Sequence, residues 1–268
     1  MRIGQPLVLA LMTAMLAAPV AARAQGMLRF VDLDSPEMKG ADMTASELDA
    51  MLRSAAGGKP LDLSTKRLSG LDLSGRQLTG IILRAAKLNR TKLAGAKLAH
   101  AVLDQAWLIE ADLTGADLVG ASLFAAQLQR AKLDGADLRG ARLAGDLSGA
   151  SLAGAKLAGV DASADMRNQS MGLMRGVLKS ANLQGAVLSG ANFARADLSF
   201  ANLKNADLTD CNLAGADLSG ADLTRATLRN ADLDGADLGA ALLPEKAALA
   251  QARNLERALN LERARTAP

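Results

Sequence analysis

Leucine recurs at every fifth position along most of this chain. One unbroken series of these central leucines runs from Leu63 to Leu143, and a second runs from Leu173 to Leu243 with Phe193 as its one exception. A period of five matches neither the two-residue alternation of a strand nor the 3.6-residue turn of an α-helix. On a helix, steps of five would spread the leucines over every face. The pattern therefore predicts a repeated unit that is not helical.

Each repeat combines a short extended piece with a bend. Ala usually stands two positions before the central Leu, and a polar residue lies between them, as in Ala111-Asp112-Leu113. In an extended segment, residues two apart share a face and the residue between them points away. The two remaining positions are mostly Gly, Ala, Ser, Thr or charged residues, which suit bends. We therefore expect the chain to coil around an interior of Leu and Ala, with hydrogen-bonded coils about 4.8 Å apart.

This unit resembles that of the pentapeptide-repeat family, and Ala111-Asp112-Leu113-Thr114-Gly115 is a close copy of the family pattern. The resemblance covers roughly residues 61–243 and depends on many repetitions rather than on one motif. It implies an all-β solenoid, a right-handed quadrilateral β-helix with four repeats in each coil. It also implies that related proteins pair through C-terminal elements, and that some members resemble DNA in shape and act on topoisomerases.

The repeat is irregular over residues 144–172. The step from Leu143 to Leu147 is one position shorter than the others, and soon afterwards the frame is lost until Leu173. One deletion near Ala144–Gly145, offset by one extra residue before Leu173, accounts for this spacing. We expect a bend or a protruding loop that divides the rod into two stacks.

The predicted loop is a candidate contact site, because rigid scaffolds often carry functional residues on loops. A tolerated insertion in a permissive repeat is the alternative. Met166, Met171 and Met174 could bind Cu(I) through their thioethers, although methionine more often fills gaps in packing. The candidate contact residues are Arg167, Asn168, Gln169, Ser170 and Met171.

The two ends differ from the repeat region, which we place at residues 59–243. Residues 25–58 should hold an extended segment followed by a short capping helix, which Thr44 and Glu47 open as a capping box. Residues 244–268 are rich in helix formers and predict a second capping helix. Such caps would cover the open ends of a coil stack. The resemblance makes the C-terminal element a candidate for homodimer formation.

Residues 1–24 are typical of a cleaved signal peptide, so we expect an exported member of the family. Arg2 precedes an apolar run from Leu7 to Val20, and Ala22-Arg23-Ala24 follows this run. The run is shorter than the roughly 20 residues that a membrane-spanning helix needs. We therefore predict cleavage after Ala24, a bacterial periplasmic or secreted location, and no membrane span in the mature chain.

The charge of the chain argues against a nucleic-acid partner. The sequence has 31 basic and 28 acidic residues, and loss of Arg2 and Arg23 with the signal peptide leaves 29 and 28, a net charge of +1. A nucleic-acid binder usually has a basic excess, and a mimic of DNA would need an acidic one.

Groups that could carry out catalysis are scarce. His100 is the single histidine and is expected at a bend, while Cys211 takes an inward Ala position. The sequence has no metal-ligand motif, phosphate loop or dinucleotide motif, which predicts a non-enzyme without cofactors. Asp197, Asp217 and Asp237 recur once in every four repeats and would stack as an outward column. Such a column could attract Ca²⁺ or simply keep the rod soluble.

A few apolar residues occupy outward positions, where the repeat is otherwise polar. With four repeats in each coil they fall on neighbouring faces, and a contiguous apolar patch often marks a partner surface. The alternative is that the segment from Met27 to Gly58 folds back and covers them. The candidate patch consists of Ile82, Val102, Trp107, Ile109 and Phe124.

These observations predict a non-catalytic, exported scaffold with a structural or protein-interaction role and an unidentified protein partner. One alternative is a DNA-mimicking protein that interacts with a topoisomerase, which would need to remain in the cytoplasm. The other is a periplasmic module that binds a metal or another ligand, which a chelator-sensitive melting curve would support.

Overall fold

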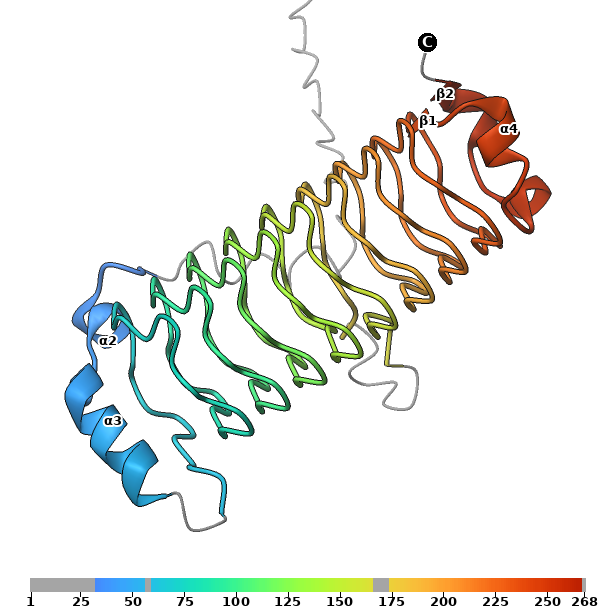
Figure 1. Cartoon of the computed structure of the whole chain (residues 1–268). Coiled ribbons are helices and arrows are strands. Elements are labelled where there is room, and N and C mark those ends of the chain that lie inside the picture. Colours follow the sequence, from blue (N-terminus) through green and yellow to red (C-terminus); the bar gives the residue numbers. More distant parts are fainter. Residues whose placement is uncertain (1–31, 56–58, 166–173, 267–268) are drawn as a thin grey trace, which may run out of the picture. The chain divides into compact units, whose positions relative to one another are not determined.

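The computed structural model describes residues 32–55, 59–165 and 174–266. The stretch from Leu33 to Pro268 forms one compact unit, distinct from Met1–Asp32. Within it, coils follow one another along a common axis, with helices at the N-terminal end and short mixed elements at the C-terminal end (Figure 1). The predicted signal peptide lies outside the described residues.

The described coils are four-sided. Parallel bridges join each outward residue of a regular coil to the outward residue four repeats later, as between Asp112 and Lys132. The predicted number of four repeats in each coil is therefore confirmed. Four columns of bridges run along the stack, and we number the sides 1 to 4 by their first residues, Asp62, Arg67, Asp72 and Gln77.

The interior is built as the alternation predicts. Leu118 and Ala116 are both 0% exposed. The Leu118 N–H donates to the Asp137 carbonyl at 2.7 Å, and the Asp137 N–H donates to the Ala116 carbonyl at 2.9 Å, which ties adjacent coils together. In the regular repeats, the residue two past the centre has left-handed backbone, with φ of +64° at Gly120 and +60° at Gln105. Glycine is common at these bends because it adopts positive φ without strain.

The shortened and lengthened corners lie at the same place in adjacent coils. Asp146, on side 2, pairs with Gln127 in the preceding coil and with Val177 in the following one. The first of these spacings is shorter than four full repeats and the second is much longer. Both irregularities fall between sides 1 and 2. The bridges continue through this region on all four sides, so the predicted division into two stacks is wrong.

The insertion is longer than the single residue that the sequence predicted. Ala162 takes the central position after Leu157 and is 0% exposed. The next described centre is Leu178, so the step between these two centres is more than three times as long as that of a regular repeat. An Ala in place of the central Leu concealed this repeat. The predicted contact residues 167–171, together with Met166, lie outside the described residues.

Two helices precede the first coil: α2 spans Pro36–Lys39 and α3 spans Ala45–Ser54. At α3, the Thr44 side chain accepts from the Glu47 N–H at 3.2 Å, and the Glu47 carboxylate accepts from the Thr44 N–H at 2.7 Å. This is the reciprocal capping box that the sequence predicts. The predicted extended conformation of the preceding segment is wrong for Pro36–Lys39, which is helical.

The C-terminal segment forms a further coil rather than one helix. β1, Leu242–Leu243, pairs in parallel with β2, Arg265–Thr266. Between them lie α4, Lys246–Leu249, and two 3₁₀ turns, η3 at Leu255–Arg257 and η4 at Leu261–Arg263.

The prediction of one capping helix over residues 244–268 is therefore wrong beyond α4. The repeated stretch Asn-Leu-Glu-Arg-Ala places Asn254 and Asn260 in left-handed backbone, which interrupts a helix. Their side chains donate to Asp232 at 2.7 Å and to Asp237 at 2.8 Å in the preceding coil. The outward residues Arg253, Leu259 and Arg265 follow one another in steps of six, so the sides of this last coil are one residue longer than the others.

In the parts of the chain that the structure describes, no helix has both the length and the apolar character needed to cross a bilayer.

Candidate interaction surfaces

The predicted apolar patch is only partly exposed. Ile82 and Val102 are stacked neighbours on side 1 and half-buried, as is Trp107 on side 2. Ile109 is 4% exposed. The Arg142 guanidinium lies 3.9 Å from the centre of the Phe124 ring and covers it. Stacking at the coil spacing thus buries much of each side chain, and a partner role for these residues stays a prediction.

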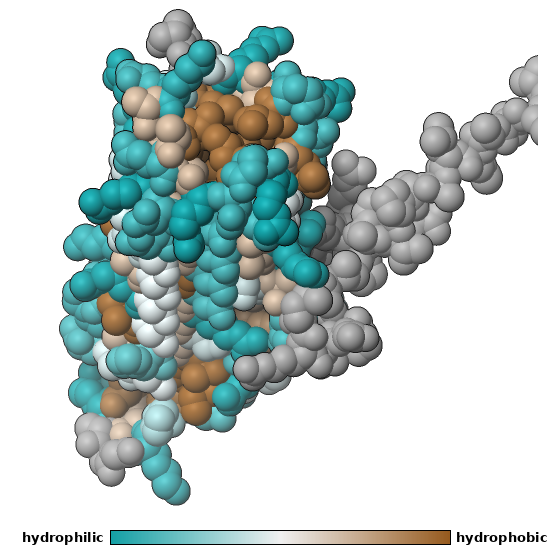
Figure 2. All heavy atoms as spheres, turned by 90° about the vertical axis from the view of Figure 1, so that its right-hand side faces the viewer, coloured by the Kyte–Doolittle hydropathy of each residue, from teal (hydrophilic) through white to brown (hydrophobic). Residues whose placement is uncertain are grey.

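The widely exposed large apolar side chains lie elsewhere. Phe200 is 61% exposed, and Leu259 is 54% exposed on the last coil. Seen from the C-terminal end, hydrophobic side chains gather over the last coils (Figure 2). The exposed large hydrophobic residues in the described part of the chain are Val187, Phe200, Leu242 and Leu259. All four belong to the C-terminal part of the stack.

Phe200 occupies a bend, where most repeats carry a small residue. Its φ is +59°, an uncommon value for a bulky side chain. A Cβ atom at Gly220 would lie 2.6 Å from Cδ1 of Phe200, so the ring rests on the Gly220 backbone of the next coil. The Lys179 ammonium is 6.0 Å from the ring centre. Sequence reasoning missed Phe200 because it examined the residues directly before and directly after each central leucine, and Phe200 lies two past Leu198. A Phe at a bend position was the available signal.

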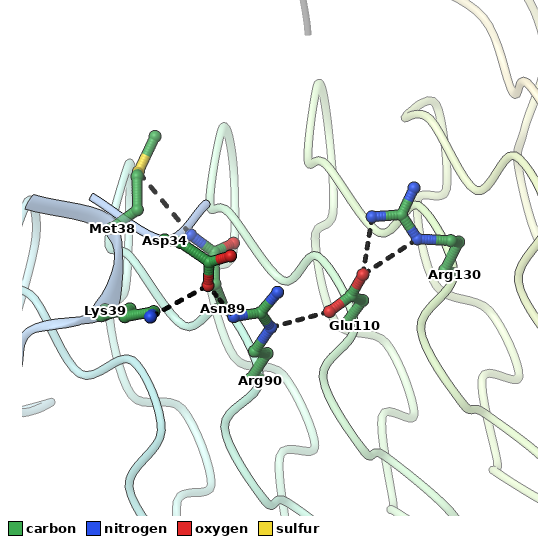
Figure 3. A network of polar contacts seen from close by, with 7 residues as sticks. All are labelled: Asp34, Met38, Lys39, Asn89, Arg90, Glu110 and Arg130. Atoms are coloured by element: carbon green, nitrogen blue, oxygen red, sulfur yellow. Dashed lines mark hydrogen bonds and ion pairs between the residues drawn. The ribbon is translucent and has the colours of Figure 1, made fainter. Parts of the chain in front are cut away.

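The N-terminal end carries a network of ion pairs (Figure 3). Arg90 pairs with Asp34 at 2.8 Å and with Glu110 at 2.7 Å, and Arg130 pairs with Glu110 at 2.6 Å. Arg90, Glu110 and Arg130 occupy equivalent bends in three successive coils and follow one corner of the stack. The two guanidiniums, Arg90 first, lower the pKa of Glu110. Asp34 also pairs with Lys39 at 3.0 Å.

Opposite charges match across this junction. We call residues 34–54 the N-terminal cap. Residues 32–55 contain six acidic and two basic residues, a net charge of −4, while residues 59–100 contain nine basic and two acidic residues, a net charge of +7. Two further ion pairs cross the junction, Asp42–Arg67 and Asp49–Arg76, each at 2.7 Å.

The cap also contacts neighbours of the predicted patch. The Lys87 ammonium donates to the Glu37 carbonyl at 3.4 Å, and the Asn89 amide contacts the Met38 sulfur at 3.8 Å. The Asn89 side-chain oxygen in turn accepts from the Ile109 N–H at 3.2 Å. The N-terminal segment therefore reaches the residues beside the patch, and whether it covers the patch itself stays a prediction.

The ion pair at α3 should make the cap sensitive to acid. The Arg76 guanidinium, which donates to Asp49, lowers the pKa of this carboxyl below its usual value. A group whose pKa is lowered by folding stabilises the protein above its unfolded pKa of about 4 and loses this effect as the pH falls further. We expect wild type to melt above Asp49→Asn at pH 7, with the difference shrinking at pH 3. Equal differences at both values would contradict this role.

His100, Cys211 and the three aspartates of the predicted column lie where the repeat places them. In the described part of the chain, no hydrogen bond or ion pair joins one of these side chains to another. His100 is exposed at a bend with φ of +58°. Asp197, Asp217 and Asp237 do stack on side 2, and each accepts a hydrogen bond from the N–H two residues later. No group of three or more His, Cys, Asp or Glu able to hold a metal occurs among the described residues.

Cys211 should be unreactive in the folded protein. It is 0% exposed at an inward position, and burial raises the pKa of its thiol to about 12. The reactive thiolate is therefore nearly absent at neutral pH. We expect a coloured disulfide reagent to label no thiol in native protein at pH 8 and one thiol per chain in denaturant. Rapid labelling of native protein would contradict the inward placement.

The sequence profile described as Pentapeptide repeats matches eight copies, over residues 67–105, 86–123, 121–145, 177–210 and 206–243. These segments cover more than half of the chain and coincide with the four-sided coils. This chain belongs to the pentapeptide-repeat family. No curated protein sequence matches it.

Several solved structures of pentapeptide-repeat proteins are similar to this one. HetL, involved in heterocyst differentiation regulation in the cyanobacterium Nostoc, is 32% identical over 83% of this chain and 94% of its own, with a TM-score of 0.41. QnrB1, a plasmid-mediated fluoroquinolone resistance protein, is 18% identical over 78% of this chain and 92% of its own, with a TM-score of 0.48. Family membership rests on the repeats rather than on these superpositions.

Proposed function

We propose that this pentapeptide-repeat protein is an exported, non-catalytic scaffold that binds a protein partner through the C-terminal part of its coil stack. Membership of the family supports a repetitive rod with a right-handed coil. The observation that carries the proposal is the position of Phe200, a large aromatic side chain that is 61% exposed at a strained bend. Aromatic side chains often dominate the energetics of protein interfaces.

The surroundings of Phe200 favour an interface. Leu242 and Leu259 are also exposed and lie toward the same end, on sides 3 and 2. Phe200 belongs to the corner between these two sides. Its ring is supported by Gly220 and flanked by Lys179, so it is presented on a rigid base. A rigid anchor loses little conformational entropy when a partner binds.

The test is a crosslinking pull-down from the native envelope fraction. Wild type is compared with a Phe200→Ser/Leu259→Ser double variant, and Gln105→Ser is the matched control because Gln105 is exposed at another bend. We expect one defined partner, retained by the control and reduced at least tenfold in the double variant. Equal recovery by all three proteins would overturn the proposed surface.

Export is part of the proposal and has its own measurement. The apolar run from Leu7 to Val20 and the small residues before Gln25 support a cleaved signal peptide. We expect N-terminal sequencing of the protein isolated from its native source to begin at Gln25. An intact Met1 in protein found entirely in the cytoplasm would contradict export.

We also propose that two copies pair through their C-terminal ends. The last coil supports this idea because Leu255, Leu261 and Leu249 pack against the core while remaining partly exposed. The DNA-mimicking alternative is not favoured, because residues 59–100 carry a net charge of +7 and a mimic of DNA needs an acidic surface.

A further inference from the structure

At the last coil, the ladder of backbone hydrogen bonds between coils ends with carbonyl groups that have no partner in the described part of the chain. In interior coils, the carbonyl before an outward residue accepts the N–H of the outward residue of the next coil. The Ala231 carbonyl, for example, accepts from the Arg253 N–H at 2.8 Å. The equivalent carbonyls of the last coil accept no hydrogen bond from any residue in the described part of the chain. They belong to Ala252, Ala258 and Ala264.

The other end of the stack is occupied by the N-terminal cap. The Arg67 N–H donates to the Asp42 carboxylate at 2.9 Å, and the Arg67 carbonyl accepts from the Asp42 N–H at 2.7 Å. Asp42 thus supplies both the acceptor and the donor that a preceding coil would supply to an outward residue. The bore beneath is closed by Leu48, which is 0% exposed.

On a second side of the first coil, a backbone carbonyl is bonded by a side chain that α3 holds in place. The Arg76 guanidinium donates to the Asp72 carbonyl at 2.6 Å, and Asp49 of α3 holds the same guanidinium at 2.7 Å. Asp72 is the outward residue of side 3, so this carbonyl is another group that a preceding coil would bond. Figure 1 shows α3 lying across this end of the stack.

The covered first coil and the open last coil have complementary ladder groups. The first coil offers the backbone N–H groups of its outward residues, and the last coil offers free carbonyls. The longer sides of the last coil present no obstacle, because they already pair with ordinary sides on their inner edge, as between Leu259 and Asp237. A second copy could therefore continue the same parallel ladder from the end of the first.

We propose that the N-terminal cap shields a docking surface for a second copy of this chain, namely the end of the first coil, which fits the open last coil of another molecule. With the cap in place, contact between copies stops at a closed pair. Without it, each molecule has two complementary ends, and a head-to-tail contact that does not close repeats into a filament. The inference is independent of the proposed protein partner.

The test compares assembly sizes of the full chain by sedimentation velocity. In Asp42→Lys/Asp49→Lys, two cap carboxylates become cations facing Arg67 and Arg76, which should release the cap. We expect species larger than a pair that grow with protein concentration, whereas wild type forms nothing beyond a pair. A second full-length variant adds Leu48→Lys to these two substitutions, in case Leu48 alone keeps the reversed cap seated.

Two additions separate a filament from nonspecific aggregation. An excess of wild type, which has an open last coil and a covered first coil, should shorten the assemblies by terminating them. Leu259→Lys/Leu261→Lys, placed in the uncapped chain, should prevent growth by charging the last coil. Asp207→Lys/Asp217→Lys, which adds cations to interior coils instead, should leave growth of the uncapped chain unchanged.

Two results would contradict the inference that the cap shields a docking surface for a second copy. Uncapped protein that keeps the size of wild type, with an unchanged far-ultraviolet circular dichroism spectrum, would overturn it. So would assemblies whose size does not respond to excess wild type or to the charged last coil. Failure of the pull-down at Phe200 would leave these results unaffected, so the two proposals can fail separately.

Discussion

Replacing Leu118 by aspartate should destabilise the coil stack by about 5 kcal/mol, because a lone carboxylate would enter the bore. Leu118 is 0% exposed and is surrounded by other central leucines and by inward alanines. No cationic side chain is buried in the described part of the bore to compensate a charge. We expect the variant to lose most of its cooperative unfolding transition in urea, followed by circular dichroism.

The adjacent residue provides the matched control. Asp117 is an outward residue of side 4, and its carboxylate accepts from the Val119 N–H at 3.2 Å. Asp117→Asn keeps an oxygen acceptor at this place, so its stability should stay within about 0.5 kcal/mol of wild type. If Leu118→Asp were as stable as Asp117→Asn, the assignment of inward and outward residues would be wrong.

Gly145→Ala should cost about 2–3 kcal/mol, through a clash that arises at the shortened corner. A Cβ atom there would lie 2.6 Å from the Ala126 carbonyl oxygen and 3.1 Å from that of Leu123. Both atoms belong to the backbone of the preceding coil, which the ladder holds in place. The missing residue between sides 1 and 2 draws the chain against that coil, so this position has room only for glycine.

A glycine at an ordinary bend separates this clash from backbone strain. Gly154 has φ of +64°, and a Cβ atom there would have no neighbour within 4 Å. Gly154→Ala should therefore cost about 1 kcal/mol, which is the strain of left-handed backbone alone. We expect thermal melts to show a clearly larger loss for Gly145→Ala. Equal losses would mean that the shortened corner can relax away from the preceding coil.

The coil could be predicted from the sequence because one physical rule repeats in every unit. A central Leu and the Ala two positions earlier must share the buried face, and this fixes both the extended piece and the bend. The register of four repeats in each coil then follows from the family resemblance. The capping box at Thr44 was equally readable, since both of its hydrogen bonds are local.

The irregular parts were harder to predict because their pattern depends on the neighbouring coil. Ala162 takes a central position that is a large hydrophobic residue, nearly always Leu, in the other repeats, so its repeat was overlooked and the insertion was underestimated. Asn254 and Asn260 lie in a stretch of helix formers, yet hydrogen bonds to Asp232 and Asp237 hold them in left-handed backbone. These bonds join residues a full coil apart and leave no local signal.

The exposure of the candidate patch was overestimated for a related reason. Trp107 and Phe124 look exposed in a pattern that counts inward and outward positions. The stacked coils, and in the case of Phe124 the Arg142 guanidinium, cover much of them. Phe200 lies at the second bend position, two past its central leucine, and is far more exposed. The bends therefore matter as much as the sides in locating contact surfaces on this fold.

The most direct test of the account is photo-crosslinking in intact cells of the native source, with a photoreactive residue at position 200 in one protein and at position 105 in another. Both positions are exposed bends, but Phe200 alone belongs to the apolar C-terminal surface. We predict one discrete adduct with a protein partner from position 200 and none from position 105. Equal adducts from both positions, or none from either, would contradict a protein-binding surface at the C-terminal part of the stack.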